Sequence, residues 1–355
     1  MSDKTKIEWT DATWNVINGC TLVDDGCKNC YAATMAGTRL KNHPSREGLT
    51  KRNAAGGYQF NGQVRFIESE LIKPLHWRKP RMVFVCAHGD LFHEDVPDEW
   101  IDRVFAVMAG NQRHTFQVLT KRPDRAHQYL TKLMDRLKTE FQGFGGGIEG
   151  LTGFYLHGIP HDVPKFPLPN VWLGTSISDQ PSADKRIPEL LATPAAVRFV
   201  SAEPLLGPVD LTMIWADNPF MHLNTLRGSI FDRLHYRRDL AAALDWVIVG
   251  GESGKNARPM HPDWARSLRD QCEAAGVAFF FKQWGEWISI YDRDRDDPDW
   301  RNCPKSGDWD KKRYLNLEGG QGFHGDKLNM MQRVGKRAAG RLLDGREWNQ
   351  MTGDV

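Results

Sequence analysis

The sequence has 355 residues and a net charge of +2, which is the balance of 47 Lys or Arg and 45 Asp or Glu residues. This length allows one large hydrophobic core or two modest ones, and the composition is that of a soluble globular protein. The charge neither requires nor excludes a polyanionic partner. The N-terminus has no apolar signal core and no stretch is apolar for the roughly 18 residues of a membrane helix, so we expect a cytoplasmic protein with no membrane partner.

Three of the six cysteines stand close together near the N-terminus. Cys20, Cys27 and Cys30 form a C-x6-C-x2-C array, which does not look like a disulfide framework. Three thiolates from one loop can hold a metal or a cluster and leave one position open for chemistry, whereas a structural zinc site closes with four ligands. Spacing alone leaves both site types open, and the nearest downstream histidine for a fourth zinc ligand is His43.

Apolar runs of strand length alternate with helical patterns after the cysteine array. The expected strands cover residues 81–86, 115–119, 171–174, 197–200, 246–249 and 277–281, and the expected helices cover 31–40, 98–108, 125–137, 183–191, 263–275 and 327–343. Nearly continuous apolar strands are typical of parallel sheets that are covered on both faces. The alternation favours βα units wound into a barrel or part-barrel, with an open doubly wound sheet as the alternative.

The predicted fold class is therefore α/β, as a partial (β/α) barrel over residues 1–287 with a C-terminal extension over 288–355 packing on it. Two insertions are expected, at about residues 141–170 and 210–244. The first contains a GxGxxG match at residues 145–150, but no strand precedes it and no helix follows, so it carries no function. The second contains the basic run RGSIFDRLHYRRDL at residues 227–240, which we expect to be helical in part.

Polar or charged residues stand where each expected strand ends. They are Asp90, Lys121, Arg122, Ser176, Ser178, Glu203, Glu252, Lys282 and Gln283. In parallel α/β folds the carboxyl ends of the strands line the active site, so we expect these side chains to converge. The competing explanation is that loops are polar in any protein.

The cysteine array and the strand-end residues lie in segments that resemble a known superfamily. The matching segments are TWNVINGCTLVDDGCKNCYA, DLFHEDVP, LTKRPDR, VWLGTSIS, RFVSAEPLLGPVDL, WVIVGGESG, FFFKQWGEW and VGKRAAGRLLDGREW. With these segments in this order along the sequence, the chain resembles the radical S-adenosylmethionine (SAM) superfamily. It most closely resembles a phage-associated family of radical-SAM-like proteins of unknown function. It departs from the superfamily's commonest C-x3-C-x2-C spacing, and Asn29 stands where an aromatic residue is frequent.

The resemblance implies a partial barrel of the radical SAM type and a [4Fe–4S] cluster held by Cys20, Cys27 and Cys30. Soft thiolates suit such a cluster, and the fourth iron would bind SAM. Electron transfer would cleave the sulfonium and release a 5′-deoxyadenosyl radical that abstracts hydrogen. A flavodoxin or ferredoxin would supply the electron, in the host cytoplasm if the chain is phage-encoded.

The same resemblance assigns roles to strand-end residues. The expected cofactor-binding residues are Tyr31, Asp90, Lys121, Ser176, Ser178 and Glu252, and the expected catalytic residues are Glu203 and Cys86. Asp90 would meet the amino group of SAM, and Lys121 or Arg122 would pair with its carboxylate. Ser176 or Ser178 would bind the ribose, and Glu203 the ribose or the substrate. Each of them could equally be an ordinary polar loop residue.

A basic stretch suggests the substrate. Between Arg39 and Arg81 ten Lys or Arg residues face three glutamates, with Tyr58 and Phe60 interspersed, which suits phosphate contacts and base stacking, although a solvated surface explains it equally. We expect a base of phage DNA, flipped out of the stack, to be modified or rearranged. The alternatives are a repair-type lyase resembling spore photoproduct lyase, with Cys86 as hydrogen donor, a non-catalytic zinc-bearing nucleic-acid-binding protein, and a small-molecule or peptide substrate.

Overall fold

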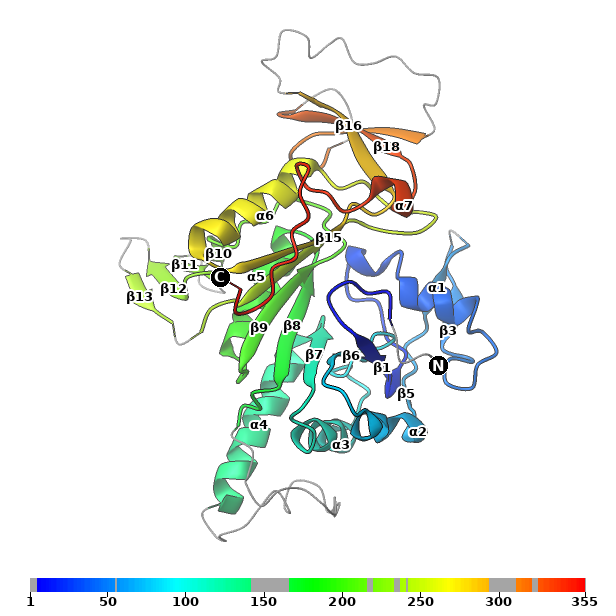
Figure 1. Ribbon diagram of the computed structural model, residues 1–355, viewed down its shortest axis with the longest axis vertical. Helices are drawn as coiled ribbons and strands as arrows, with labels where there is room; N and C mark the ends of the chain where they lie inside the picture. The colour runs from blue at the N-terminus through cyan, green and yellow to red at the C-terminus, as the bar shows by residue number, and fades with distance from the viewer. Residues whose placement is uncertain are drawn as a thin grey trace. The chain divides into compact units, whose positions relative to one another are not determined.

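The computed structural model describes residues 5–54, 56–141, 166–215, 220–232, 237–240, 242–293, 311–320 and 325–354 (Figure 1). The chain divides into two compact units. Unit 1 comprises Met1–Val23, Ala32–Thr175 and Glu189–Phe199, and unit 2 comprises Asp24–Tyr31, Ser176–Pro188 and Val200–Val355. The glycine-rich stretch with the GxGxxG match, and most of the first expected insertion, lie outside the described residues.

Seven strands form the main sheet. Their order is β1 (Ala12–Trp14), β6 (Met82–Val85), β7 (Thr115–Thr120), β8 (Val171–Ile177), β9 (Val197–Ala202), β14 (Trp246–Gly250) and β15 (Ala278–Gln283). This spatial order is the order of the chain, whereas a doubly wound sheet reverses its strand order at a switch point. The α/β class is confirmed, the strand order agrees with the predicted part-barrel, and the doubly wound alternative is wrong.

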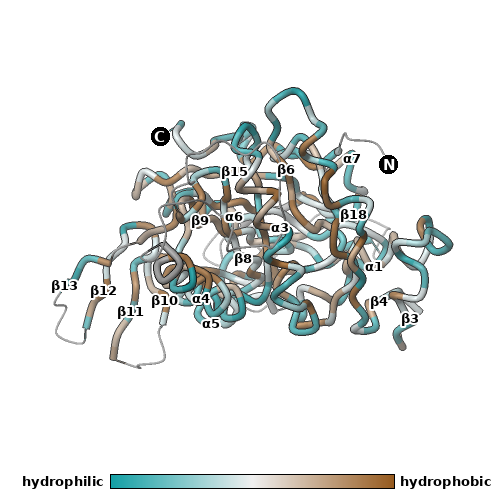
Figure 2. The backbone as a smooth tube through the Cα atoms, turned by 90° about the horizontal axis from the view of Figure 1, so that it is seen from below, coloured by the Kyte–Doolittle hydropathy of each residue, from teal (hydrophilic) through white to brown (hydrophobic). Residues whose placement is uncertain are grey.

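In unit 1 the strands pair in parallel, β1 with β6, β6 with β7 and β7 with β8. Their side chains build a core in which Trp14 and Phe116 are fully buried. The strand β6 is drawn in brown in Figure 2, as an apolar strand buried on both faces should be. Two helices, α3 (Asp98–Ala109) and α4 (Pro123–Phe141), follow β6 and β7 at the predicted places.

Short elements lie between β1 and β6 in unit 1. Strand β2 (Ile17–Asn18) pairs with β5 (Arg65–Phe66), and β3 (Thr50–Arg52) pairs with β4 (Tyr58–Phe60), both antiparallel. The helix α2 (Glu68–Leu71) and the 3-10 helix η2 (Lys73–His76) follow them. The helix expected over residues 31–40 is shorter, because α1 (Tyr31–Gly37) ends in a series of turns.

In unit 2 strands β14 and β15 pair in parallel, with Val247 opposite Phe279. The helix α6 (Pro262–Ala275) packs against both strands and ends at Gly276, whose φ of +70° suits a glycine C-cap. Helix α5 (Gln180–Ala192) follows β8, and η1 (Asp25–Cys27) is a 3-10 turn in the cysteine loop. The helices α5 and α6 occupy the places that the apolar pattern predicts.

The basic run at residues 227–240 was expected to be partly helical, and this prediction is wrong. Strands β11 (Met221–Asn224), β12 (Ser229–Asp232) and β13 (Arg237–Asp239) form an antiparallel sheet with β10 (Ile214–Trp215). The left-handed φ of +59° at Gly228 makes a turn where a helix would have to continue. The strand β13 is teal in Figure 2, as expected for three charged residues that are all exposed.

The helix expected over residues 327–343 is also wrong. Strand β18 (Leu328–Arg333) lies between β16 (Trp287–Arg293) and β17 (Lys312–Leu315), and only α7 (Lys336–Ala339) is helical. The first four residues of β18 are all buried, and Gly335 and Gly340 with positive φ bound the short helix. Within the described part of the chain, no helix is long and apolar enough to cross a membrane.

Candidate functional site

Asp90 follows strand β6 in unit 1 and is buried. Its Oδ1 accepts hydrogen bonds from the Phe92 amide (3.0 Å) and the Thr120 hydroxyl (2.7 Å). Its Oδ2 accepts from the Lys121 amide (3.2 Å) and from Nη1 of Arg122 (3.1 Å). The two carboxylate oxygens of Asp90 thus accept four hydrogen bonds, which is about their full capacity. Because three of the four donors belong to residues 120–122, Asp90 positions the chain at the end of β7.

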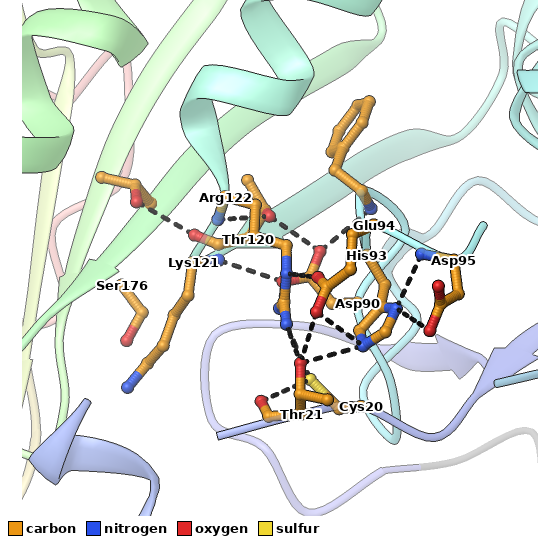
Figure 3. A network of polar contacts seen from close by, with 12 residues as sticks. Cys20, Thr21, Asp90, His93, Glu94, Asp95, Thr120, Lys121, Arg122 and Ser176 are labelled. Carbon is orange, nitrogen blue, oxygen red and sulfur yellow. Dashed lines mark hydrogen bonds and ion pairs between the residues drawn. The ribbon is translucent and has the colours of Figure 1, made fainter. Parts of the chain in front are cut away.

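The Arg122 guanidinium joins this carboxylate to the cysteine loop. Its Nε donates to Oε2 of Glu94 (2.5 Å), its Nη2 donates to the Thr21 hydroxyl, and its Nη1 lies 3.6 Å from Sγ of Cys20 (Figure 3). Burial lowers the pKa of Arg122, but Asp90 and the Cys20 sulfur outweigh burial, so the pKa lies above its ordinary value. A guanidinium beside a cysteine favours the thiolate, which is the form that binds metals.

A buried histidine supports the same group. The Asp95 amide donates to Nδ1 of His93 (3.1 Å), which leaves Nε2 to donate to the Thr21 hydroxyl (3.0 Å). Thr21 in turn donates to Oε1 of Glu94 (2.9 Å). Burial raises the pKa of Glu94, but the hydrogen bonds from Arg122 and Thr21 outweigh burial and lower it to about 2. Glu94 is therefore a carboxylate at neutral pH, and Thr21 next to Cys20 is held from both sides.

In unit 2 a buried carboxylate holds the C-x2-C turn. Glu252 follows β14, and its Oε2 accepts from Nδ2 of Asn29 (3.0 Å), the residue before Cys30. The same carboxylate accepts from the Arg258 amide (2.8 Å) and guanidinium (2.6 and 2.9 Å). Burial lowers the pKa of Arg258, but Glu252 outweighs burial and raises it above its ordinary value. The turn is thus anchored by a charge-assisted pair that is largely withdrawn from water.

Two arginines hold the chain just before this turn. Nη2 of Arg258 donates to the carbonyl of Asp25 (2.9 Å). Arg186 of α5 is buried, and it donates to Oδ2 of Asp24 (2.5 Å) and to the Ser176 carbonyl (2.6 Å). Asp24 is the residue that precedes η1, so its fixed position sets where the 3-10 turn to Cys27 begins. The second half of the cysteine loop is therefore held by side chains from two segments, helix α5 and the loop between β14 and α6.

A second ion pair lies at the ends of β9 and β15 in unit 2. Nζ of Lys282 lies 2.8 Å from both carboxylate oxygens of Glu203, and Nε2 of Gln283 donates to Oε1 of Glu203 (3.2 Å). Gly250 makes room for this carboxylate, because a Cβ there would lie 3.2 Å from Cδ of Glu203. The Ser176 hydroxyl donates to the Glu203 carbonyl (3.3 Å). The Ser178 hydroxyl is buried and has no hydrogen-bond partner among the described residues.

The cysteines fall into two kinds. Cys20, Cys27 and Cys30 are partly exposed, whereas Cys86 and Cys272 are buried, and burial raises the pKa of each buried thiol to about 12. Buried thiols of this kind stay protonated at neutral pH and are therefore poor nucleophiles and poor metal ligands. Cys303 lies outside the described residues. Across the described ranges, no three His, Cys, Asp or Glu side chains are grouped as they would be around a single metal ion.

The comparison with protein families matches residues 4–352 to a family described as "Protein of unknown function (DUF5131)". The chain belongs to this family. No curated protein and no solved structure matches the chain.

The structure of this DUF5131 chain brings the expected strand-end residues together within each unit. In unit 1, Arg122 contacts both Asp90 and Cys20, while the side chain of Lys121 points away from them (Figure 3). In unit 2, Glu203 meets Lys282 and Gln283, and Glu252 meets Asn29. Tyr31 begins α1 with half of its surface exposed.

Sequence reasoning missed Thr21, His93, Glu94, Asn29, Arg186 and Arg258. Four of them stand in segments that the resemblance had already singled out: Thr21 and Asn29 in the cysteine array, and His93 and Glu94 in DLFHEDVP. A polar residue inside a matched segment was therefore a usable signal. Arg186 had none, because a buried arginine on an amphipathic helix has the same sequence signature as an exposed one.

Proposed function

We propose that this chain is a radical SAM enzyme in which Cys20, Cys27 and Cys30 hold a [4Fe–4S] cluster. The observation that carries the proposal is the contact of Arg122 with Cys20, 3.6 Å from nitrogen to sulfur. Cluster irons are held by thiolates, and hydrogen bonds to the sulfurs tune the cluster potential. We infer that the three thiols share one cluster because they lie within eleven consecutive residues.

The donor set suits a cluster. The three loop thiols are partly exposed, as ligands of an added group must be, and the two buried thiols are not. Each thiolate of a cluster binds a different iron atom, so a cluster does not require the ligand grouping of a single ion. When it is bound and reduced, such a cluster cleaves SAM and supplies a 5′-deoxyadenosyl radical that abstracts hydrogen from the substrate.

Residues of the chain bind and orient the cofactor in this proposal. Lys121 pairs with the carboxylate of SAM, because the neighbouring Arg122 guanidinium already binds two carboxylates and a thiol. The orphaned hydroxyl of Ser178 accepts or donates a hydrogen bond to the ribose. Glu203, held by Lys282, contacts the ribose or the substrate. A flavodoxin or ferredoxin delivers the electron.

The proposed substrate is a base of phage DNA that is modified or rearranged. Support comes from unit 1, where six Lys or Arg residues and one acidic residue occur between positions 39 and 65. Phosphate contacts from such residues supply most of the sequence-independent affinity for nucleic acid.

One observation favours a second candidate, the repair-type lyase. Cys86 directly follows β6 with a φ of +57°, which is uncommon for a residue other than glycine, and burial raises its pKa to about 12. A hydrogen-atom donor must carry its S–H at the moment of reaction, and a thiol with this pKa does. A Cys86→Ala variant that still cleaves SAM but no longer turns over a DNA lesion would favour the lyase.

The test of the class is anaerobic purification followed by iron, sulfide and zinc analysis, and then addition of dithionite and SAM. We expect close to four irons per chain and release of 5′-deoxyadenosine. The loop variants Cys20→Ala, Cys27→Ala and Cys30→Ala should lose the iron, whereas the matched control Cys272→Ala should keep it. One zinc, no iron and no cleavage of SAM would instead identify a non-catalytic zinc-bearing protein.

A further inference from the structure

The segment of unit 1 that contains the hairpin β3–β4 is basic. The segment from residue 39 to 65 has six Lys or Arg residues and the single acidic residue Glu47, although the whole chain carries only +2. Four of the six cations are exposed, namely Arg39, Lys41, Lys51 and Arg52. Lys51 and Arg52 lie on β3 itself, and Arg39 and Lys41 lie in the segment that precedes it.

These exposed cations are not neutralised by the protein. Among the described residues, none of the four pairs with a carboxylate, whereas Arg103, Arg125 and Arg136 of the same unit each do. Arg52 donates instead to the carbonyl of Gly56 (2.5 Å). Unpaired surface cations in one cluster create a local positive potential that attracts a polyanion.

The hairpin also holds one guanidinium in a fixed orientation. The Arg52 guanidinium lies over the Tyr58 ring, 4.2 Å from its centroid, and Tyr58 is its cross-strand partner in the hairpin. The ring is itself fixed by α1, because a Cβ on Gly37 would lie 2.0 Å from the Tyr58 ring. A stacked guanidinium presents its planar fork with little loss of side-chain entropy, which suits a phosphate.

The hairpin is narrow enough to enter a groove. Its two strands are antiparallel, with Lys51 opposite Gln59, and such strands lie about 4.8 Å apart. Gly56 in the turn has open space around it, so nothing widens the tip at that residue. The turn is braced by Asn53, whose Oδ1 accepts from the Gly57 amide (2.8 Å). A two-stranded ribbon fits the major groove of B-DNA, which is roughly 12 Å wide.

We infer that β3–β4 is a DNA-binding ribbon that docks in the groove of a duplex, with Lys51 and Arg52 on the phosphates. The inference deepens the proposed function, since it rests on a nucleic-acid substrate, but it does not depend on the cluster. Charge complementarity decides the partner: four exposed cations without a carboxylate partner, one of them the arginine stacked on tyrosine, favour a regular array of phosphates over a protein surface.

The test is fluorescence anisotropy of a labelled 20-base-pair duplex with the full chain, without reductant or SAM, from 50 to 300 mM salt. We expect the double variant Lys51→Gln with Arg52→Gln to bind about tenfold more weakly and to lower the slope of log affinity against log salt by about 1.8, or 0.9 for each phosphate that the variant no longer neutralises. Arg52→Lys keeps the positive charge but not the planar guanidinium. Its affinity for the duplex should lie between those of the wild type and the double variant. Lys132→Gln removes a single positive charge from an exposed position of α4 and should change neither quantity.

Unchanged affinity and slope in the double variant would overturn the inference, as would tighter binding of a single strand than of the duplex. Far-ultraviolet circular dichroism of each variant checks that the hairpin change leaves the fold intact. Failure of the two proposals is distinguishable, because duplex binding is measured without SAM cleavage. Cleavage without duplex binding contradicts only the ribbon, and duplex binding without iron contradicts only the enzyme.

Discussion

The Nδ2 group of Asn29 donates a 3.0 Å hydrogen bond to Oε2 of Glu252, which lies 223 residues later in the chain. A buried carboxylate at the end of β14 thereby holds the residue between Cys27 and Cys30. Because the same carboxylate also binds the Arg258 amide and guanidinium, one side chain couples the position of the cysteine turn to the loop after β14. Part of the proposed cluster geometry is therefore decided far from the cysteines in sequence.

Replacing this carboxylate should lower metal loading. We expect Glu252→Ala to reduce iron per chain and to cost about 3 kcal/mol of unfolding free energy, since Arg258 loses its partner in a largely buried pair. Asn29→Ala removes only the hydrogen bonds that its amide donates to Glu252 and to the Asn256 carbonyl, so it should reduce iron at a cost of about 1 kcal/mol for each bond. Iron analysis and urea unfolding measure the two effects. Wild-type iron content in both variants would show that the clamp does not position the turn.

The Arg122–Asp90 pair should matter far more for stability than a neighbouring surface pair. Both side chains are at most 10% exposed, so Arg122→Met leaves Asp90 buried and unpaired, and we expect a loss of about 3–5 kcal/mol in urea unfolding. The matched control is Arg125→Met, whose partner Asp98 is 48% exposed, with an expected loss below about 1 kcal/mol. Equal losses in the two variants would contradict the assigned role of burial.

His88 should make the protein less stable in mild acid. Burial and the neighbouring Arg46 lower the pKa of His88 to about 4, from an ordinary value of 6.5. Between these two values the unfolded chain binds a proton that the folded chain does not, so stability is lost as pH falls from 6.5 to 4. The slope is at most about 1.4 kcal/mol per pH unit for this one proton.

His88→Asn should flatten that part of the stability curve, since an asparagine oxygen can still accept from Nε of Arg46. Urea unfolding at several pH values measures the effect. Because burial also lowers the pKa of His93 and His114, part of the slope should remain in the variant. An identical slope in wild type and variant would show that His88 titrates normally.

The absence of a side chain at Gly250 should be needed for full turnover. A Cβ there lies 3.2 Å from Cδ of Glu203, so Gly250→Ala should displace the carboxylate from Lys282. We expect slower formation of 5′-deoxyadenosine or of product at unchanged iron content. The control is Gly276→Ala, where the left-handed backbone costs about 1–2 kcal/mol of stability but the space is open, and turnover should stay constant. Equal turnover in both variants would remove Glu203 from the reaction.

The sequence predicted the main sheet well because its strands are apolar runs that need no partner to be recognised. It was wrong at β12 and β18, where Phe231 and Met330 stand in stretches that suit a helix and a strand about equally. At both places antiparallel pairing with neighbouring strands decided the outcome. Such non-local hydrogen bonds leave no mark in the local pattern.

By itself the sequence determined the α/β class, the positions of six of the seven sheet strands and the polar residues at their ends, because hydrophobic periodicity and chain order are local properties. Only the tertiary structure decided which polar residues meet. It joined Arg122 to Cys20, Glu252 to Asn29 and Lys282 to Glu203. The reason is that a buried charge needs a partner, and which partner reaches it depends on how distant segments come together in the fold.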